Sequence, residues 1–105
     1  MLSRVNSLET ASDRIDDVAR VVREVVYPAI SAARGYVGYV VLGNRETGQA
    51  LGVTLWDNES DRRASDAKAR QIRPVVEAET GGVMRAVDQY DVLFFDLRPD
   101  VRHVV

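Results

Sequence analysis

The spacing of apolar residues divides the chain into strands and helices. Residues 2–10 alternate loosely between apolar and polar side chains, which is typical of a strand. Apolar residues then recur every three or four positions, which predicts an amphipathic helix that begins at Ser12 or Asp13. Pro28 has no backbone N–H and should kink or shorten this helix, and Gly35 should end it. The apolar row of the predicted helix contains Ile15, Val18, Val22, Val25 and Ala29.

Two further strands and a second helix follow. Residues 36–42 and 49–56 are rich in β-branched and aromatic residues, and the spacer between them consists of turn-forming residues. This pattern predicts a β-hairpin. The second helix should begin at Asp57 or Asn58 and reach about residue 73.

The last part of the chain has a weaker periodicity. Pro74 should start a short extra turn that ends at Gly81 and Gly82. The last strand should cover residues 83–97, with residues 98–105 as a tail. The row that the second helix is expected to turn toward the sheet has small or polar side chains, namely Ala64, Ala67 and Gln71.

The predicted order of elements is β-α-β-β-α-β, which is that of the ferredoxin-like α+β fold with an antiparallel sheet. A chain of this length forms one domain, residues 1–105, with its core at about 3–97. Strict alternation places Tyr36, Val40 and Leu42 on one face of the second strand and Val37, Tyr39 and Val41 on the other. Two helices cover only one face of such a sheet, and an uncovered face is usually polar. We therefore expect a homodimer through the sheet face.

Composition excludes several classes of protein. The 105 residues contain no cysteine and one histidine, His103, which excludes disulfide frameworks, thiol nucleophiles and multi-histidine metal sites within one chain. A net charge of −2 argues against a general nucleic-acid binder. The first 17 residues contain no apolar stretch of the length that a secretory signal requires, and the longest apolar run in the chain, residues 36–43, is too short to span a membrane. We therefore expect a soluble cytoplasmic protein without a membrane partner.

The chain resembles the antibiotic biosynthesis monooxygenase family of dimeric α/β barrels. The resemblance covers about residues 3–97 and rests on Gly35-Tyr36-Val37-Gly38, Glu46-Thr47-Gly48, the segment from Leu51 to Glu59, Asn6 and Pro28. It implies a monooxygenase-like protein that needs no cofactor and acts on a small phenolic or quinol-type molecule. Such a substrate can itself lose a proton and pass an electron to dioxygen, so the protein supplies a dry cavity and hydrogen-bond donors. The alternative is a non-catalytic member that binds a ligand or serves as an accessory protein of a biosynthetic or stress pathway.

The resemblance also implies the site residues. Trp56 matches the family's tryptophan, and Trp56 and Asn6 are the predicted catalytic residues. An asparagine four residues before Trp56 would strengthen the match, but that position is Gly52. The predicted substrate-binding residues are Tyr39, Tyr36, Gln71, Ala64 and Ala67. Each also has a purely structural interpretation: the aromatic residues as core, Asn6 as a partner of the sheet edge, and the small row as a place of close helix–sheet contact.

Three other functions are rejected. The haem-degrading relatives carry a second tryptophan and a haem-ligating histidine on the second helix, where this chain has Ser65 and Pro74. Catalysis by a serine nucleophile with His103 as its general base is rejected, because His103 lies too near the chain end to be held in place. Residues 34–41 resemble the signature of RNA-recognition domains, but they contain one residue too many and fall in the second strand instead of the third.

Overall fold

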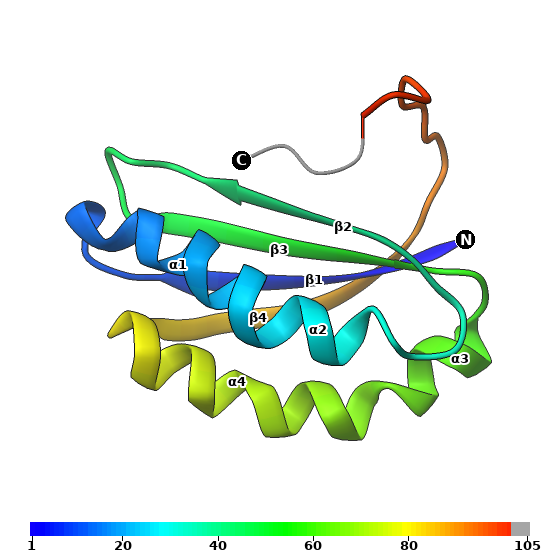
Figure 1. Cartoon of the computed structure of the whole chain (residues 1–105), viewed down its shortest axis with the longest axis horizontal. Helices are drawn as coiled ribbons and strands as arrows, with labels where there is room; N and C mark the ends of the chain where they lie inside the picture. The colour runs from blue at the N-terminus through cyan, green and yellow to red at the C-terminus, as the bar shows by residue number, and fades with distance from the viewer. Residues whose placement is uncertain (102–105) are drawn as a thin grey trace.

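The computed structural model describes residues 1–101 and confirms the ferredoxin-like α+β fold. The elements are β1 (Leu2–Glu9), η1 (Ser12–Arg14), α1 (Ile15–Val21), η2 (Val22–Val26), α2 (Tyr27–Ile30), β2 (Tyr36–Gly43), β3 (Gln49–Trp56), α3 (Glu59–Ala64), α4 (Asp66–Thr80) and β4 (Val83–Asp91). The sheet is antiparallel, with the order β2-β3-β1-β4. The helices lie against one face of it (Figure 1).

The first helical stretch is interrupted by a π turn, η2, just before Pro28. Tyr27 N–H donates to Val22 O, five residues back, where an α-helix would use the carbonyl four residues back. The wide turn shifts the helix face, so that Val26 is buried and Val25 is only half-buried. The apolar row predicted from uniform α-helical spacing is therefore correct only up to Val18. The buried side chains of this stretch are Ile15, Val18, Val21, Val26 and Ile30.

The second helical stretch breaks at Ser65, and the prediction of a break at Pro74 was wrong. Asn58 caps α3 by accepting a hydrogen bond from Asp61 N–H at 2.8 Å, as the sequence predicted. Pro74 lies inside α4 at an exposed position, and the helix continues through it to Thr80. The helix ends, as predicted, at Gly81, whose φ is +68°.

A register shift in β2 places two tyrosines on the same face of the sheet. Tyr36 pairs with Trp56, but Gly38 pairs with Leu55, so one extra residue lies between them. Tyr36 and Tyr39 consequently both pack against the core that the helices cover. The prediction that they point to opposite faces was wrong, because it assumed unbroken alternation.

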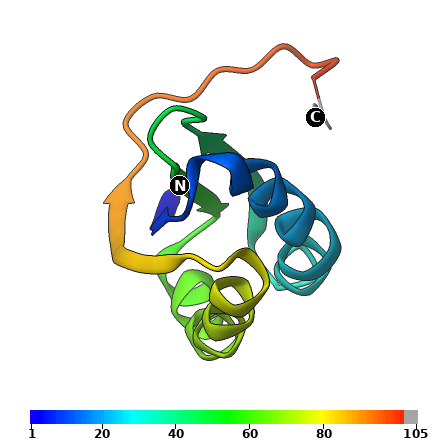
Figure 2. The same ribbon diagram turned by 90° about the vertical axis from the view of Figure 1, so that its left-hand side faces the viewer.

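The opposite face of the sheet is open and apolar. Val40 and Leu42 are exposed on it, and Val53 is half-buried. β4 ends at Asp91, not at residue 97 as predicted, and the chain continues as an extended segment along this open side (Figure 2). That segment is strongly exposed, with Leu93 94%, Phe94 88% and Phe95 48% accessible.

The end of the predicted tail, including His103, lies outside the described residues. No helix in the described part of the chain is long and apolar enough to cross a membrane.

Candidate functional site

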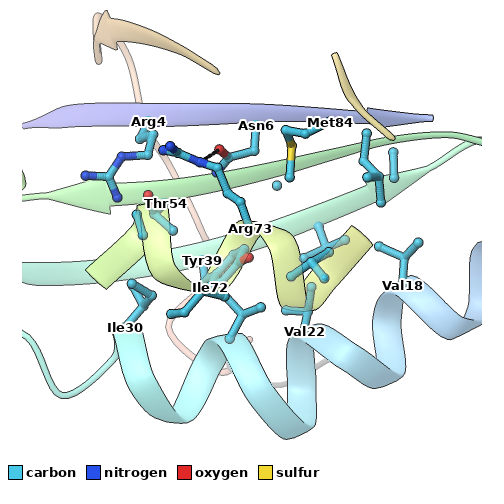
Figure 3. A pocket seen from close by; sticks show the side chains of 17 residues that line it. Arg4, Asn6, Val18, Val22, Ile30, Tyr39, Thr54, Ile72, Arg73 and Met84 are labelled. Atoms are coloured by element: carbon cyan, nitrogen blue, oxygen red, sulfur yellow. Dashed lines mark hydrogen bonds between the residues drawn. The ribbon is translucent and has the colours of Figure 1, made fainter. Parts of the chain in front are cut away.

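A cavity of about 60 Å³ lies between the sheet and the helices, and Figure 3 shows the side chains that line it. The helices contribute apolar side chains, among them Val18, Val22, Ile72 and Val76. The polar lining residues are Arg4, Asn6, Tyr39, Thr54 and Arg73. An apolar cavity with a few converging polar groups is the usual form of a small-molecule site.

Strand register brings the polar lining residues together. Arg4 and Asn6 are two residues apart on β1, so both point to the helix-covered face. In the β1–β3 ladder, Arg4 is opposite Thr54 and Asn6 is opposite Gly52. On the other edge of β3, in the β2–β3 ladder, Tyr39 of β2 is opposite Thr54. The three adjacent strands thus supply the polar wall of the cavity.

Arg4 anchors one end of the cavity. Its side chain is 1% exposed, and Nη2 donates to Arg62 O at 3.0 Å, Ser65 Oγ at 2.7 Å and Asp66 Oδ1 at 2.5 Å. Its guanidinium carbon lies 5.6 Å from the centroid of the Trp56 ring, within cation–π range. Nε of Arg4 is buried and has no hydrogen-bond partner in residues 1–101. This arginine ties β1 to the junction between α3 and α4.

Tyr39 packs over Gly52. A Cβ atom at position 52 would lie 3.4 Å from Tyr39 Oη, so the phenol hydroxyl stands directly over the glycine. Burial raises the pKa of Tyr39 strongly; Tyr36 raises it further, and Arg4 opposes the shift. The Tyr39 hydroxyl therefore remains protonated and able to donate a hydrogen bond at any physiological pH.

Arg73 reaches from α4 across the cavity to β1, as Figure 3 shows. Its Nε donates to Asn6 Oδ1 at 3.3 Å. Burial lowers the pKa of Arg73, and the charge of Arg4 lowers it further, while Asp66 opposes the shift. The guanidinium thus lies in a half-buried and already cationic environment.

Trp56 lies behind the cavity instead of lining it. It is completely buried, and its indole N–H donates to Thr54 Oγ1 at 2.9 Å. Tyr36 also lies outside the lining residues and packs edge-to-face against Trp56, with ring centroids 6.1 Å apart. Of the predicted site residues, the structure brings Asn6 and Tyr39 together in the cavity.

The predicted inward row of the second helix was wrong. Ala64, Ala67 and Gln71 are all exposed. The prediction assumed that small side chains would face the sheet. The residues that face the sheet are instead those at positions 65, 69, 72, 76 and 80. The polar Ser65 is buried in this row because its hydroxyl accepts a hydrogen bond from Arg4.

Sequence reasoning also missed Arg4 and Arg73. Their burial is decided by partners far along the chain, which no local pattern contains. The available signal was the position of Arg4 on the same face as Asn6 and Leu8, an inward-pointing face by alternation. Within residues 1–101 no group of three or more His, Cys, Asp and Glu side chains could hold a metal ion.

Solved structures with the same architecture are found among oxygenases. A monooxygenase of Streptomyces coelicolor from the gene ActVA-Orf6, in complex with nanaomycin D, superposes with a TM-score of 0.69 over 94% of this chain and 92% of its own, at 12% identity. SnoaB, a cofactor-independent oxygenase from Streptomyces nogalater, has a TM-score of 0.63 over 94% and 97%, at 12% identity. The chain has the fold of the antibiotic biosynthesis monooxygenases. The resemblance seen in the sequence is confirmed at the level of the fold.

Other similarities add detail about this monooxygenase fold. A dimeric ferredoxin-like protein from an uncultured marine organism has a TM-score of 0.63 over 92% of this chain and 97% of its own, at 17% identity. Two uncharacterized proteins of Mycobacterium tuberculosis, Rv2557 and MT2634, are 28% identical over 90 residues, or 86% of this chain. The chain spans only 40% of the length of these two relatives. No protein-family model matches the chain.

Proposed function

We propose that the protein is a monooxygenase-like enzyme that uses no cofactor and acts on a small phenolic or quinol-type molecule. The observation that carries this proposal is the cavity, in which the protonated Tyr39 hydroxyl and the Asn6 amide lie among apolar helix side chains. Preorganised donors in a site of low polarity stabilise an oxyanion more strongly than water does. The fold, shared with oxygenases, supports the same interpretation.

The proposed reaction needs only the substrate and dioxygen. The substrate gives a proton to solvent water and becomes an oxyanion, which Tyr39 and Asn6 stabilise by hydrogen bonds. The electron-rich anion then reduces dioxygen. For an activated CH₂ group, as in an anthrone, two C–H bonds break, one oxygen atom remains on carbon as C=O, and the other leaves as water with the two hydrogens.

Trp56 and Tyr36 act in this proposal as positioning residues. The indole N–H of Trp56 holds Thr54 Oγ1 at 2.9 Å, which orients a hydroxyl in the cavity wall. Tyr36 packs against the indole ring and fixes its orientation. Both aromatic residues thus contribute to the site through Thr54, and not by contact with the substrate.

We expect Tyr39→Phe to lower kcat for oxygen consumption by about 10²-fold, because removing one oxyanion donor typically has an effect of this size. Oxygen uptake with a panel of hydroquinones and anthrones measures it. Tyr90→Phe is the matched control, since Tyr90 is 57% exposed and outside the cavity, and it should leave the rate unchanged. A Tyr39→Phe rate equal to that of Tyr90→Phe contradicts the proposed role.

The second candidate function is a non-catalytic ligand-binding or accessory protein. Gly52 favours it, because the position four residues before Trp56 offers no side-chain donor. The same panel separates the two candidates. Saturable binding of phenols with no oxygen consumption by the wild type supports the accessory role and excludes the enzyme.

The working form in this proposal is a homodimer through the open sheet face. The exposed apolar side chains of β2 and of residues 93–97 would then be buried against a second copy. A dimeric protein of the same fold supports this arrangement. A two-fold axis lets one apolar patch serve both partners.

A further inference from the structure

We propose that the cavity binds its aromatic ligand as an anion, whose charged oxygen is held by the Arg73 guanidinium beside the Asn6 amide. The ligand class is an aromatic ring system bearing a phenolate or a carboxylate. This inference rests on the proposed function only for the location of the site and for the aromatic nature of the ligand.

The balance of charge in the cavity wall is the first argument. Two guanidinium groups line the cavity, those of Arg4 and Arg73, and no carboxylate does. Asp66, the nearest acidic partner, is bound to Arg4 at 2.5 Å and also lies 3.5 Å from Arg62 Nη1. Arg73 forms no ion pair within residues 1–101. The cavity is therefore cationic, and an anion is the charge that it can accept without repulsion.

The free donors of Arg73 are the second argument. A guanidinium carries five N–H donors in a planar fork that matches a carboxylate or a phenolate oxygen. Only Nε of Arg73 has a partner in the described chain, the Asn6 carbonyl oxygen at 3.3 Å. That bond fixes the guanidinium at the cavity wall and leaves its two terminal nitrogens for a ligand.

The depressed pKa of Arg73 agrees with a missing counter-charge. Burial is its main cause, and the charges of Arg4 and Arg70 add to it, against the opposing effect of Asp66. A bound anion would relieve both the desolvation and the repulsion. The Tyr39 hydroxyl, which remains protonated, would add a neutral donor to the same oxygen.

The size of the cavity limits the ligand. About 60 Å³ is well below the roughly 150 Å³ of an apolar cavity that holds a whole benzene ring. The charged end of one ring therefore enters between β1 and α4, with the rest of the ring nearer the mouth. The further rings of a fused system such as an anthrone would lie outside the cavity mouth.

The test compares matched anionic and neutral rings by calorimetry at mildly alkaline pH, where 4-nitrophenol and benzoic acid are both ionised. The phenolate pair is 4-nitrophenol and 4-nitroanisole, and the carboxylate pair is benzoate and benzamide. We expect the wild type to bind at least one anion about tenfold or more tightly than its neutral partner. A preference only in the first pair identifies a phenolate ligand, and a preference only in the second identifies a carboxylate.

Variants of Arg73 assign the effect to this residue. Arg73→Gln should lower anion affinity about tenfold and leave the neutral rings within twofold, whereas Arg73→Lys should keep most of the preference. Lys68→Gln, at an exposed position on the same helix, is the matched control and should change neither affinity. Thermal melting confirms that each variant is folded.

Two outcomes overturn the inference. One is equal affinity of the wild type for charged and neutral rings, and the other is an anion preference that Arg73→Gln and Arg73→Lys both retain in full. Its failure is distinct from that of the proposed function: oxygen uptake without anion preference rejects only the inference. Anion binding without oxygen uptake rejects only the enzyme.

Discussion

Asp66→Ala should lower the free energy of unfolding by about 3 kcal/mol, the lower end of the usual cost of removing one partner from a buried ion pair, because the Asp66 side chain is itself 30% exposed. Arg4 is 1% exposed, and Asp66 is the carboxylate that compensates its charge. Without it the guanidinium retains only Arg62 O and Ser65 Oγ as hydrogen-bond partners, both neutral. Nε of Arg4 already lacks a hydrogen-bond partner in the described structure, so no further protein group is at hand to replace the lost bond. Urea unfolding measures the change.

Asp16→Ala is the matched control for this prediction. Asp16 also forms a short ion pair, with Arg45 at 2.7 Å, but both side chains are largely exposed. Exposed pairs contribute about 0–1 kcal/mol, so this variant should unfold nearly as the wild type does. The double variant Arg4→Met/Asp66→Ala should recover most of the loss, because it removes the uncompensated charge and leaves an apolar side chain beside Trp56. Equal stability of Asp66→Ala and Asp16→Ala would contradict the structural role of the pair.

Val40→Asp should dissociate the proposed homodimer, raising its dissociation constant by about 100-fold or more. Val40 is 40% exposed in the single chain and lies on the open sheet face. A two-fold axis brings two copies of the new carboxylate into one interface, where like charges cost several kcal/mol. Light scattering at micromolar concentration should give about twice 11.7 kDa for the wild type and about 11.7 kDa for the variant.

Val75→Asp is the matched control for the dimer. Val75 has nearly the same exposure, 42%, but belongs to α4 on the helical side of the molecule. This variant should remain dimeric, because the proposed interface does not include the helices. A wild-type mass near 11.7 kDa rejects the dimer, and equal masses for the two variants reject the open face as the interface.

Local sequence signals predicted the order of elements correctly. Asn58 caps its helix, Gly81 ends the next one, and the hairpin between β2 and β3 forms where turn residues cluster. These signals are reliable because each depends on contacts between residues only a few positions apart in the sequence. The helix break predicted at Pro74 was wrong, because α4 continues through this exposed position.

The candidate site was predicted only in part. The family resemblance pointed to Asn6 and Tyr39, and both side chains line the cavity. Tyr36 was placed on the wrong face, since one extra residue in β2 reverses the alternation and no local pattern marks it. Trp56 was predicted to be catalytic, but it does not line the cavity, and its indole N–H donates to Thr54 Oγ1.

The sequence by itself determined the β-α-β-β-α-β order, the apolar character of both sheet faces and the absence of thiol chemistry, because these depend on composition and short-range periodicity. Only the tertiary structure decided which polar residues the cavity contains. Arg4 is buried because Asp66 lies 62 residues further along the chain, and Arg73 meets Asn6 across a separation of 67 residues. A charged side chain enters the interior only where the fold supplies its partner, and that partner is set by the packing of α4 on β1.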